Sequence, residues 1–209
     1  MKSSIATKSI MKEYIGELKK CLDALDLDKV EGLVDILEDA FKRKKTIFIL
    51  GNGGSASNAS HMACDLGKGT LLKVYDETEP RFRVISLTDN AALMTAFAND
   101  LSYEDVFIQQ LRNLVSPGDL VIVLSASGKS KNIIKAVQYA KKCKAVTIGL
   151  LGFTDGGALA HLVDHALIIS SNRYGICEDL HLVLNHLITT CVAKRNHNHK
   201  KRSNKHYPQ

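Results

Sequence analysis

The feature that most constrains the fold is a glycine-rich turn between an apolar run and a helical pattern. Residues 46–50 (TIFIL) predict a buried strand, and residues 51–56 (GNGGSA) follow it directly. A segment with helical periodicity and no proline then continues to Asp65. Glycines let the backbone approach a ligand closely, and the free N–H groups and dipole of a helix start attract anions. The order strand, glycine turn, helix therefore predicts a cradle for an anion.

Two side chains beyond the turn suggest which anion. His61 and Asp65 are spaced i, i+4, so both project from one face of the helix that follows the glycines. A phosphate held at the turn would leave the rest of its molecule over these two side chains. We therefore interpret the stretch as a sugar-phosphate site.

The rest of the chain alternates strand and helix patterns. We expect strands at residues 46–50, 81–87, 120–124, 145–151 and 165–169. We expect helices at residues 90–98 and 103–115, around 133–140, and from about 175 to 193. This alternation predicts an α/β fold, with a doubly wound five-stranded parallel sheet and right-handed crossovers. Ligands bind such sheets beyond the carboxyl ends of the strands.

An N-terminal helical pair precedes the sheet, over residues 9–25 and 28–43, with Asp28 as the expected N-cap of the second helix. Its apolar stripe is wide, which favours a role in subunit contacts. The alternative is that the pair only covers its own sheet. We assign residues 1–193 to a single domain that includes these helices.

The net charge of +6 belongs to one end of the chain. Residues 194–209 hold six basic and no acidic residues, so the preceding part carries 22 of each sign. A basic segment rich in Asn, His and Ser predicts a disordered tail. A nucleic-acid-binding domain would show excess positive charge in its folded part, so we expect no nucleic-acid partner.

The chain predicts a cytoplasmic protein without membrane association. No apolar run reaches the roughly 18–20 residues that a membrane helix needs. The first residues lack the apolar region of a secretory signal. The five cysteines are scattered without a C-x-x-C pair, which is typical of reduced thiols.

A second small-residue loop follows the third predicted strand. Ser125, Ser127 and Ser130 place hydroxyl groups beside the free N–H groups of a helix start, which suits a phosphate. Lys129 either adds a cation there or faces solvent. The alternative is an ordinary strand-to-helix turn with Ser as N-cap. Because both loops end parallel strands, we expect them to converge on one ligand.

The last predicted helix carries a second acidic–histidine set, which consists of Glu178, His181 and His186. Glu178 and His186 lie just over two turns apart, so both can border one cavity. Together with His61 and Asp65 they offer two imidazoles and two carboxylates, a donor set that zinc accepts. Two cysteines flank this set, and we interpret both as small buried residues rather than ligands. They are Cys64 and Cys177.

The motifs together resemble those of the SIS-domain phosphoheptose isomerases. The resemblance rests on residues 51–56, on His61 with an acid at position 65, on Asn99-Asp100, on residues 125–130 (SASGKS) and on the helix at 178–186. It covers about residues 5–192. It implies a flavodoxin-like SIS domain that forms a homotetramer, with active sites at the subunit interfaces and one zinc ion per subunit.

The resemblance also implies roles for individual residues. The positions that match the family's substrate-binding residues are Asn52, Gly53, Gly54, Ser55, Asp65, Asn99, Asp100, Ser125, Ala126, Ser127, Ser130 and Glu178. The positions that match its metal ligands are His61, Asp65, Glu178 and His186. Among these, Asp65 and His186 match its acid/base pair. The implied reaction converts sedoheptulose 7-phosphate to a D-glycero-D-manno-heptose 7-phosphate through an enediol, for lipopolysaccharide or capsule synthesis.

Four departures from the family pattern bear on this prediction. The family usually has Glu at position 65, Gln at position 178 and Arg-Ile before that Gln, and its second loop usually reads STSGNS. An isomerase of another sugar phosphate is therefore one alternative. A non-enzymatic tetrameric SIS protein that binds the replication initiator is a second, although it would lack the full set of histidines and carboxylates. A sugar-phosphate sensor fused to a DNA-binding domain is a third, but this chain has no room for such a domain.

Overall fold

A single parallel sheet forms the centre of the protein, in a computed structural model that describes residues 6–203. The strands are β1 (Thr46–Gly51), β2 (Arg83–Ser86), β3 (Leu120–Ser125), β4 (Val146–Leu151) and β5 (His165–Ile168). Their order is β2-β1-β3-β4-β5, and all neighbouring pairs are parallel. The predicted five-stranded doubly wound sheet is confirmed. The order reverses between β1 and β3, which is where such sheets bind ligands.

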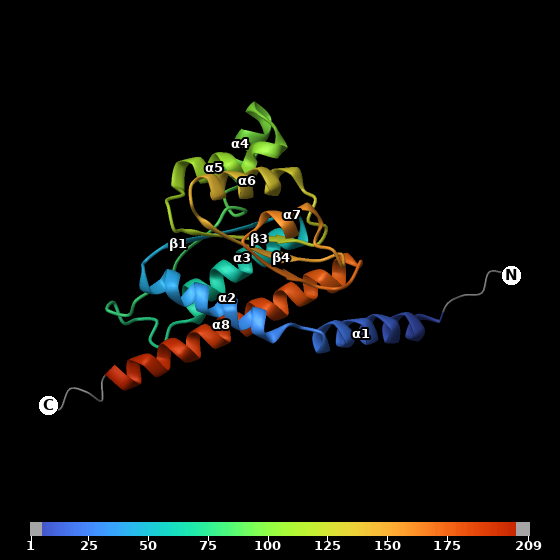
Figure 1. Ribbon diagram of the computed structural model, residues 1–209, viewed down its shortest axis with the longest axis horizontal. Coiled ribbons are helices and arrows are strands. Elements are labelled where there is room, and N and C mark those ends of the chain that lie inside the picture. The colour runs from blue at the N-terminus through green and yellow to red at the C-terminus, as the bar shows by residue number, and fades with distance from the viewer. Residues whose placement is uncertain (1–5, 204–209) are drawn as a thin grey trace.

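Helices cover both faces of the sheet (Figure 1). They are α1 (Thr7–Asp23), α2 (Leu27–Lys42), α3 (Gly54–Cys64), α4 (Ala91–Asp100), α5 (Val106–Leu114), α6 (Lys131–Lys142), α7 (Gly157–Leu162) and α8 (Tyr174–Ser203). One core joins α2, α3 and α8 to the sheet, and the other joins α5, α6 and α7 to its opposite face. Every residue of β3 is buried, as expected for a central strand with helices on both faces.

The N-terminal pair forms as expected, with shifted ends. The second helix begins at Leu27, and its N-cap is Asp26, whose carboxylate accepts a hydrogen bond from the N–H of Lys29 at 3.0 Å. Asp28 lies inside the first turn, so its predicted capping role is wrong. The first helix lies along α8, where the Tyr14 hydroxyl donates to Asp179 at 2.5 Å. It extends beyond the rest of the molecule (Figure 1).

The last helix is longer than predicted. It continues through Ser203, so the prediction of disorder from residue 194 onward does not hold for residues 194–203, and residues 204–209 lie outside the described part. Arg195 holds the extension to α2 through ion pairs with Asp35 at 2.5 Å and Glu31 at 2.7 Å. None of the helices in residues 6–203 combines the length and apolar character needed to cross a bilayer.

Candidate functional site

The glycine turn after β1 is shaped by close contacts that exclude side chains. A Cβ on Gly51 would lie 2.6 Å from the carbonyl oxygen of Ser55, and Gly53 has a left-handed φ of 57°. A Cβ on Gly54 would overlap the carboxylate of Glu178. Backbone atoms therefore exclude a side chain at Gly51, and the left-handed φ disfavours one at Gly53. A side chain at Gly54 would displace the Glu178 carboxylate.

The serine loop after β3 leaves hydroxyl groups available. Ser125 Oγ accepts the N–H of Gly128 at 3.0 Å, which closes the loop. Ser130 stands at the N-cap position of α6 but its side chain makes no capping hydrogen bond. The alternative, in which the Ser130 side chain serves as the N-cap of α6, is therefore not supported. Lys129 is exposed to solvent.

The two loops converge as predicted on one cavity of about 120 Å³. The predicted substrate-binding residues that line it are Asn52, Ser55, Ser125, Ala126, Ser127, Ser130 and Glu178. The cavity lies at the carboxyl ends of β1 and β3, on the two sides of the point where the strand order reverses.

Two residues that the sequence did not point to, Asn132 and Tyr103, hold Asn52 in the first loop. Asn52 and Asn132 exchange two amide hydrogen bonds of 3.0 Å, and the Tyr103 hydroxyl donates to Asn52 Oδ1 at 2.9 Å. Asn132 is buried in the first turn of α6. The sequence signal for Asn132 is an amide residue directly after the serine loop, because a buried amide needs hydrogen-bond partners.

Three of the four predicted metal ligands form a cluster. The Nε2 atoms of His61 and His186 lie 3.2 Å apart, and Asp65 Oδ2 lies 3.3 Å from the first and 3.5 Å from the second. These ligand atoms all lie within 4.8 Å of one another. Two imidazole nitrogens and a carboxylate facing a common point are a donor set that suits zinc, with room for further ligands from substrate or water. The cluster therefore fits a metal ion.

The start of a π-helical turn helps to aim Asp65 at this cluster. This turn, Asp65–Gly69, follows α3 directly, and such widened turns often occur at functional sites. Asn185, which sequence reasoning missed, donates its amide to Asp65 Oδ2 at 2.7 Å and is fully buried. Its signal was a polar residue beside His186 on an otherwise apolar face. The contacts of the Asp65 carboxylate with Asn185, His61 and His186 all use Oδ2, so among the described residues Oδ1 has no partner.

Glu178, the fourth predicted ligand, lies elsewhere. Its carboxylate lies over Gly54, at the start of α3, and lines the serine cavity rather than the histidine cluster. The positive end of the α3 dipole favours a carboxylate at this place. Its backbone carbonyl accepts the Asn58 amide at 2.9 Å, which joins α3 to α8. An acidic side chain thus occupies the wall of the predicted phosphate cavity.

His181, the remaining residue of the acidic–histidine set, faces the core. His181 is fully buried, its Nε2 lies 3.2 Å from the Leu151 carbonyl oxygen, and its Nδ1 has no partner within the described residues. Burial lowers the pKa of His181 to about 4.

Cys177 is buried as predicted, whereas Cys64 is exposed, so the prediction for Cys64 is wrong.

Asn99 and Asp100 do not line the serine cavity. They end α4, where the Asn99 amide donates to Asp100 Oδ1 at 2.9 Å, and both are exposed. This helix lies on the face of the sheet opposite α3 and α8 (Figure 1). Within one chain, then, the structure does not bring these two residues to the histidine cluster.

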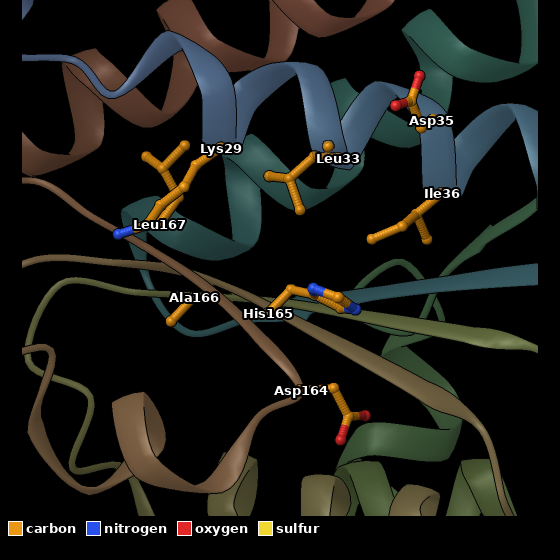
Figure 2. A pocket seen from close by; sticks show the side chains of 9 residues that line it. Lys29, Leu33, Asp35, Ile36, Asp164, His165, Ala166 and Leu167 are labelled. Atoms are coloured by element: carbon orange, nitrogen blue, oxygen red, sulfur yellow. The ribbon is translucent and has the colours of Figure 1, made fainter.

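A different cavity of about 410 Å³ lies between α2 and the edge strand β5. Figure 2 shows Lys29, Leu33 and Ile36 projecting from α2 toward the segment that carries His165 and Leu167. It contains none of the predicted site residues. Its one cation, Lys29, pairs with Asp26 at 3.5 Å, so the cavity is poorly suited to a phosphate despite its size.

Comparison with known proteins decides the family. The SIS-domain family model matches residues 13–152. A probable phosphoheptose isomerase of Thermoplasma acidophilum is 34% identical over 88% of this chain and 98% of that protein. The phosphoheptose isomerase of Helicobacter pylori strain P12 is 35% identical over 88% of this chain and 94% of its own. The chain belongs to the phosphoheptose isomerase family.

A solved structure agrees with this membership. A phosphoheptose isomerase from Neisseria gonorrhoeae superposes with a TM-score of 0.79 at 26% identity, over 90% of this chain and 96% of that one. The likeness therefore extends over nearly the whole of that phosphoheptose isomerase and not over the sheet alone.

We predict that Asn185 supports metal binding by holding Asp65. Asn185→Leu keeps the branched shape of the side chain but removes the donor to Oδ2. Loss of such a partner typically weakens metal affinity by about 10–100-fold. Competition with a chromogenic zinc chelator measures the change. Thr189→Val, which removes only the 3.4 Å hydrogen bond to the Asn185 carbonyl, is the matched control and should change affinity less. Equal zinc affinity in Asn185→Leu and the wild type would contradict the role.

We also predict that His181 makes the protein acid-sensitive. Between pH 6.5, the ordinary pKa of a histidine, and about 4, the unfolded chain binds a proton that the buried ring excludes. The free energy of unfolding therefore falls as the pH falls through this range, by up to about 3 kcal/mol. Urea denaturation at pH 7 and pH 5 measures the change in the free energy of unfolding between the two pH values. This change should be smaller in His181→Gln than in the wild type. Replacing exposed His165 by Gln is the control, and an identical effect of the two changes would refute the assignment.

Proposed function

We propose that this protein is an aldose–ketose isomerase that converts sedoheptulose 7-phosphate to a D-glycero-D-manno-heptose 7-phosphate. The observation that carries the proposal is the arrangement along α3 and α8. A serine-lined anion cavity lies at one end, and the cluster of His61, Asp65 and His186 lies about two turns further along the same helices. The two curated relatives described above are named for the same reaction.

The phosphate would bind in the cavity between the two loops. Ser127 and Ser130 offer hydroxyl groups there, and the first N–H groups of α3 point toward bound negative charge. Binding energy from this far end of the substrate positions the reacting carbons over the cluster. The substrate would therefore lie along the seam between α3 and α8.

The proton transfer would be carried out by Asp65. The reaction removes a proton from C1 of the ketose and returns one to C2, through an enediol. Asp65 Oδ2 is held by the Asn185 amide, which leaves Oδ1 as the atom that accepts the C1 proton and delivers it to C2. His186 would exchange the proton between the two oxygens of the enediol while its Nε2 is not bound to the metal. Both roles need the carboxylate and the imidazole on the same side of the substrate, as the cluster has them.

A zinc ion would be held by His61, His186 and Asp65, with Glu178 outside this set in the present geometry. When bound, zinc supplies a Lewis acid that polarises the substrate's carbonyl and hydroxyl oxygens. The tight approach of two imidazole nitrogens and a carboxylate supports this assignment.

The assembly would be a homotetramer in the cytoplasm, serving heptose synthesis for lipopolysaccharide or capsule. Apolar side chains of α1 support an oligomer, since Ile10, Met11 and Ile15 are 47%, 57% and 51% exposed. Active sites at subunit interfaces would also give Asn99 and Asp100 a place, because a neighbouring subunit can present them to the sugar.

Substitutions in the cluster test the chemistry. We expect Asp65→Asn to lower kcat by about 10²–10⁴-fold, the usual contribution of a general base, with the assembly unchanged. His186→Ala should lose more activity than His61→Ala, because both remove a metal ligand but only His186 also moves a proton. Aldose formation from sedoheptulose 7-phosphate, followed by NMR with and without chelator, measures both. Near-normal turnover in Asp65→Asn would overturn the base assignment, and equal losses in the two histidine variants would restrict His186 to metal binding.

Glu178 offers a second test, directed at the phosphate. Its carboxylate lines the cavity that the phosphate would enter, so the two negative charges repel. We expect Glu178→Gln to lower KM by about fivefold, which corresponds to ~1 kcal/mol for a partly solvated pair. Glu77→Gln, an exposed carboxylate remote from the cavity, is the control. A KM that stays constant in Glu178→Gln would show that the phosphate binds elsewhere.

A further inference from the structure

Two adjoining cavities lie at the opposite end of the sheet from the catalytic loops. They border the amino-terminal ends of β1 and β2, where Thr46 and Arg83 pair as the first residues of their strands. The strands are parallel, so the glycine and serine loops lie at the other end. A ligand bound here would therefore not share the catalytic site of the same chain.

The larger cavity, of about 530 Å³, is strongly basic. Its charged lining comprises five cations and two carboxylates, namely Lys42, Lys44, Lys45, Arg81, Arg83, Glu77 and Glu79. The Glu79 carboxylate is buried and accepts the N–H groups of Leu72 and Lys73 at 3.1 and 2.8 Å, which holds it in the loop. The net positive charge attracts an anion with more than one negative charge.

Some of these cations are available to a ligand. Lys44 and Arg83 are exposed, and neither has an ion-pair partner within the described residues. Lys45 and Arg81 donate to carbonyl oxygens, those of Pro117 at 2.8 Å and Val74 at 2.7 Å, and neither forms an ion pair with another described residue. Like charges held together in this way repel one another unless an anion joins them.

The smaller cavity, of about 230 Å³, offers a different surface. It shares Phe41, Lys42, Glu79 and Pro80 with the basic cavity, so the two adjoin. The Phe41 ring packs against Phe82 with centroids 4.6 Å apart, and it presents an apolar wall. Asn196 adds an amide that both donates and accepts hydrogen bonds. An aromatic heterocycle, which has a flat apolar face and polar edges, fits the Phe41 wall and the Asn196 amide.

The extension of α8 completes this second cavity. Asn196 and His197 line it, and His197 Nε2 lies 3.2 Å from the Thr70 carbonyl oxygen. The ion pairs of Arg195 with α2 hold the extension in this position. The basic C-terminal segment thus contributes to a built cavity that the catalytic site does not use.

We propose that these two cavities bind a nucleoside di- or triphosphate, with the phosphates among the cations and the base against Phe41 beside Asn196. A chain of phosphates matches the several cations of the larger cavity, and a base matches the aromatic and amide lining of the smaller one. The combined size falls within the range of small-molecule sites, roughly 300–1,000 Å³. This inference stands independently of the proposed isomerase activity.

Titration calorimetry with the full chain tests the site, with ATP and GTP as probes and tripolyphosphate and adenosine as fragments. EDTA is present throughout, so that phosphate cannot bind through a metal in the histidine cluster. We expect Lys44→Ala and Arg83→Ala each to weaken nucleotide binding by about tenfold, the effect of losing one charged hydrogen-bond donor. Asn196→Ala should weaken ATP or GTP binding but leave tripolyphosphate unaffected.

Lys144→Ala is the matched control. Lys44 and Lys144 both have a left-handed φ, 55° and 61°, in the turn before a strand, and Lys144 lines neither cavity. Equal weakening in Lys44→Ala and Lys144→Ala would overturn the site. Displacement of the nucleotide by a sugar phosphate would place it in the serine cavity instead. Tripolyphosphate binding as tight as that of the nucleotides, or binding of oligonucleotides alone, would also overturn the proposal.

Discussion

The close parallel packing of α3 against α8 is the constraint on which the site depends. Because Gly54 has no side chain, the first turn of α3 lies directly against Glu178, and the Asn58 amide bonds to the same residue. Further along the same seam, His61 meets His186 and Asp65 meets Asn185. A side chain at Gly54 would overlap the Glu178 carboxylate and force that carboxylate away from the start of α3. The glycine turn therefore has a packing role in addition to the ligand-binding role that we propose for it.

The seam also explains how a short acid can serve in a site where the family usually has Glu. Asp65 begins a π-helical turn, and its Oδ2 is oriented by a fully buried amide, which leaves Oδ1 for the proton transfer that we propose. Positional precision in such a site comes from the residues that hold the reacting group, and Asn185 supplies it here. The carboxylate of Glu178 at the α3 N-terminus is a second departure, and it places a negative charge where the substrate's phosphate is proposed to bind.

Charge in this protein is distributed by the fold in a way that a count along the chain cannot show. The part before residue 194 has equal numbers of acidic and basic residues, which suggested no charged face. The fold nevertheless brings cations from the α2–β1 turn and from the start of β2 to one cavity. The C-terminal extension joins them as a helix held by Arg195, rather than as the disordered tail that its composition predicted.

The sequence by itself determined the α/β class, the five strands, the two small-residue loops and the family, because alternating apolar periodicity and glycine positions are local properties. It also identified His61, Asp65 and His186, since their spacing places them on helix faces. Only the tertiary structure decided that Glu178 lies at the α3 N-terminus, that Asn132 and Asn185 hold Asn52 and Asp65, and that His181 faces the core. These outcomes depend on which faces of distant helices meet and on which polar atoms find partners there. Such contacts between remote segments leave no periodic pattern in the chain.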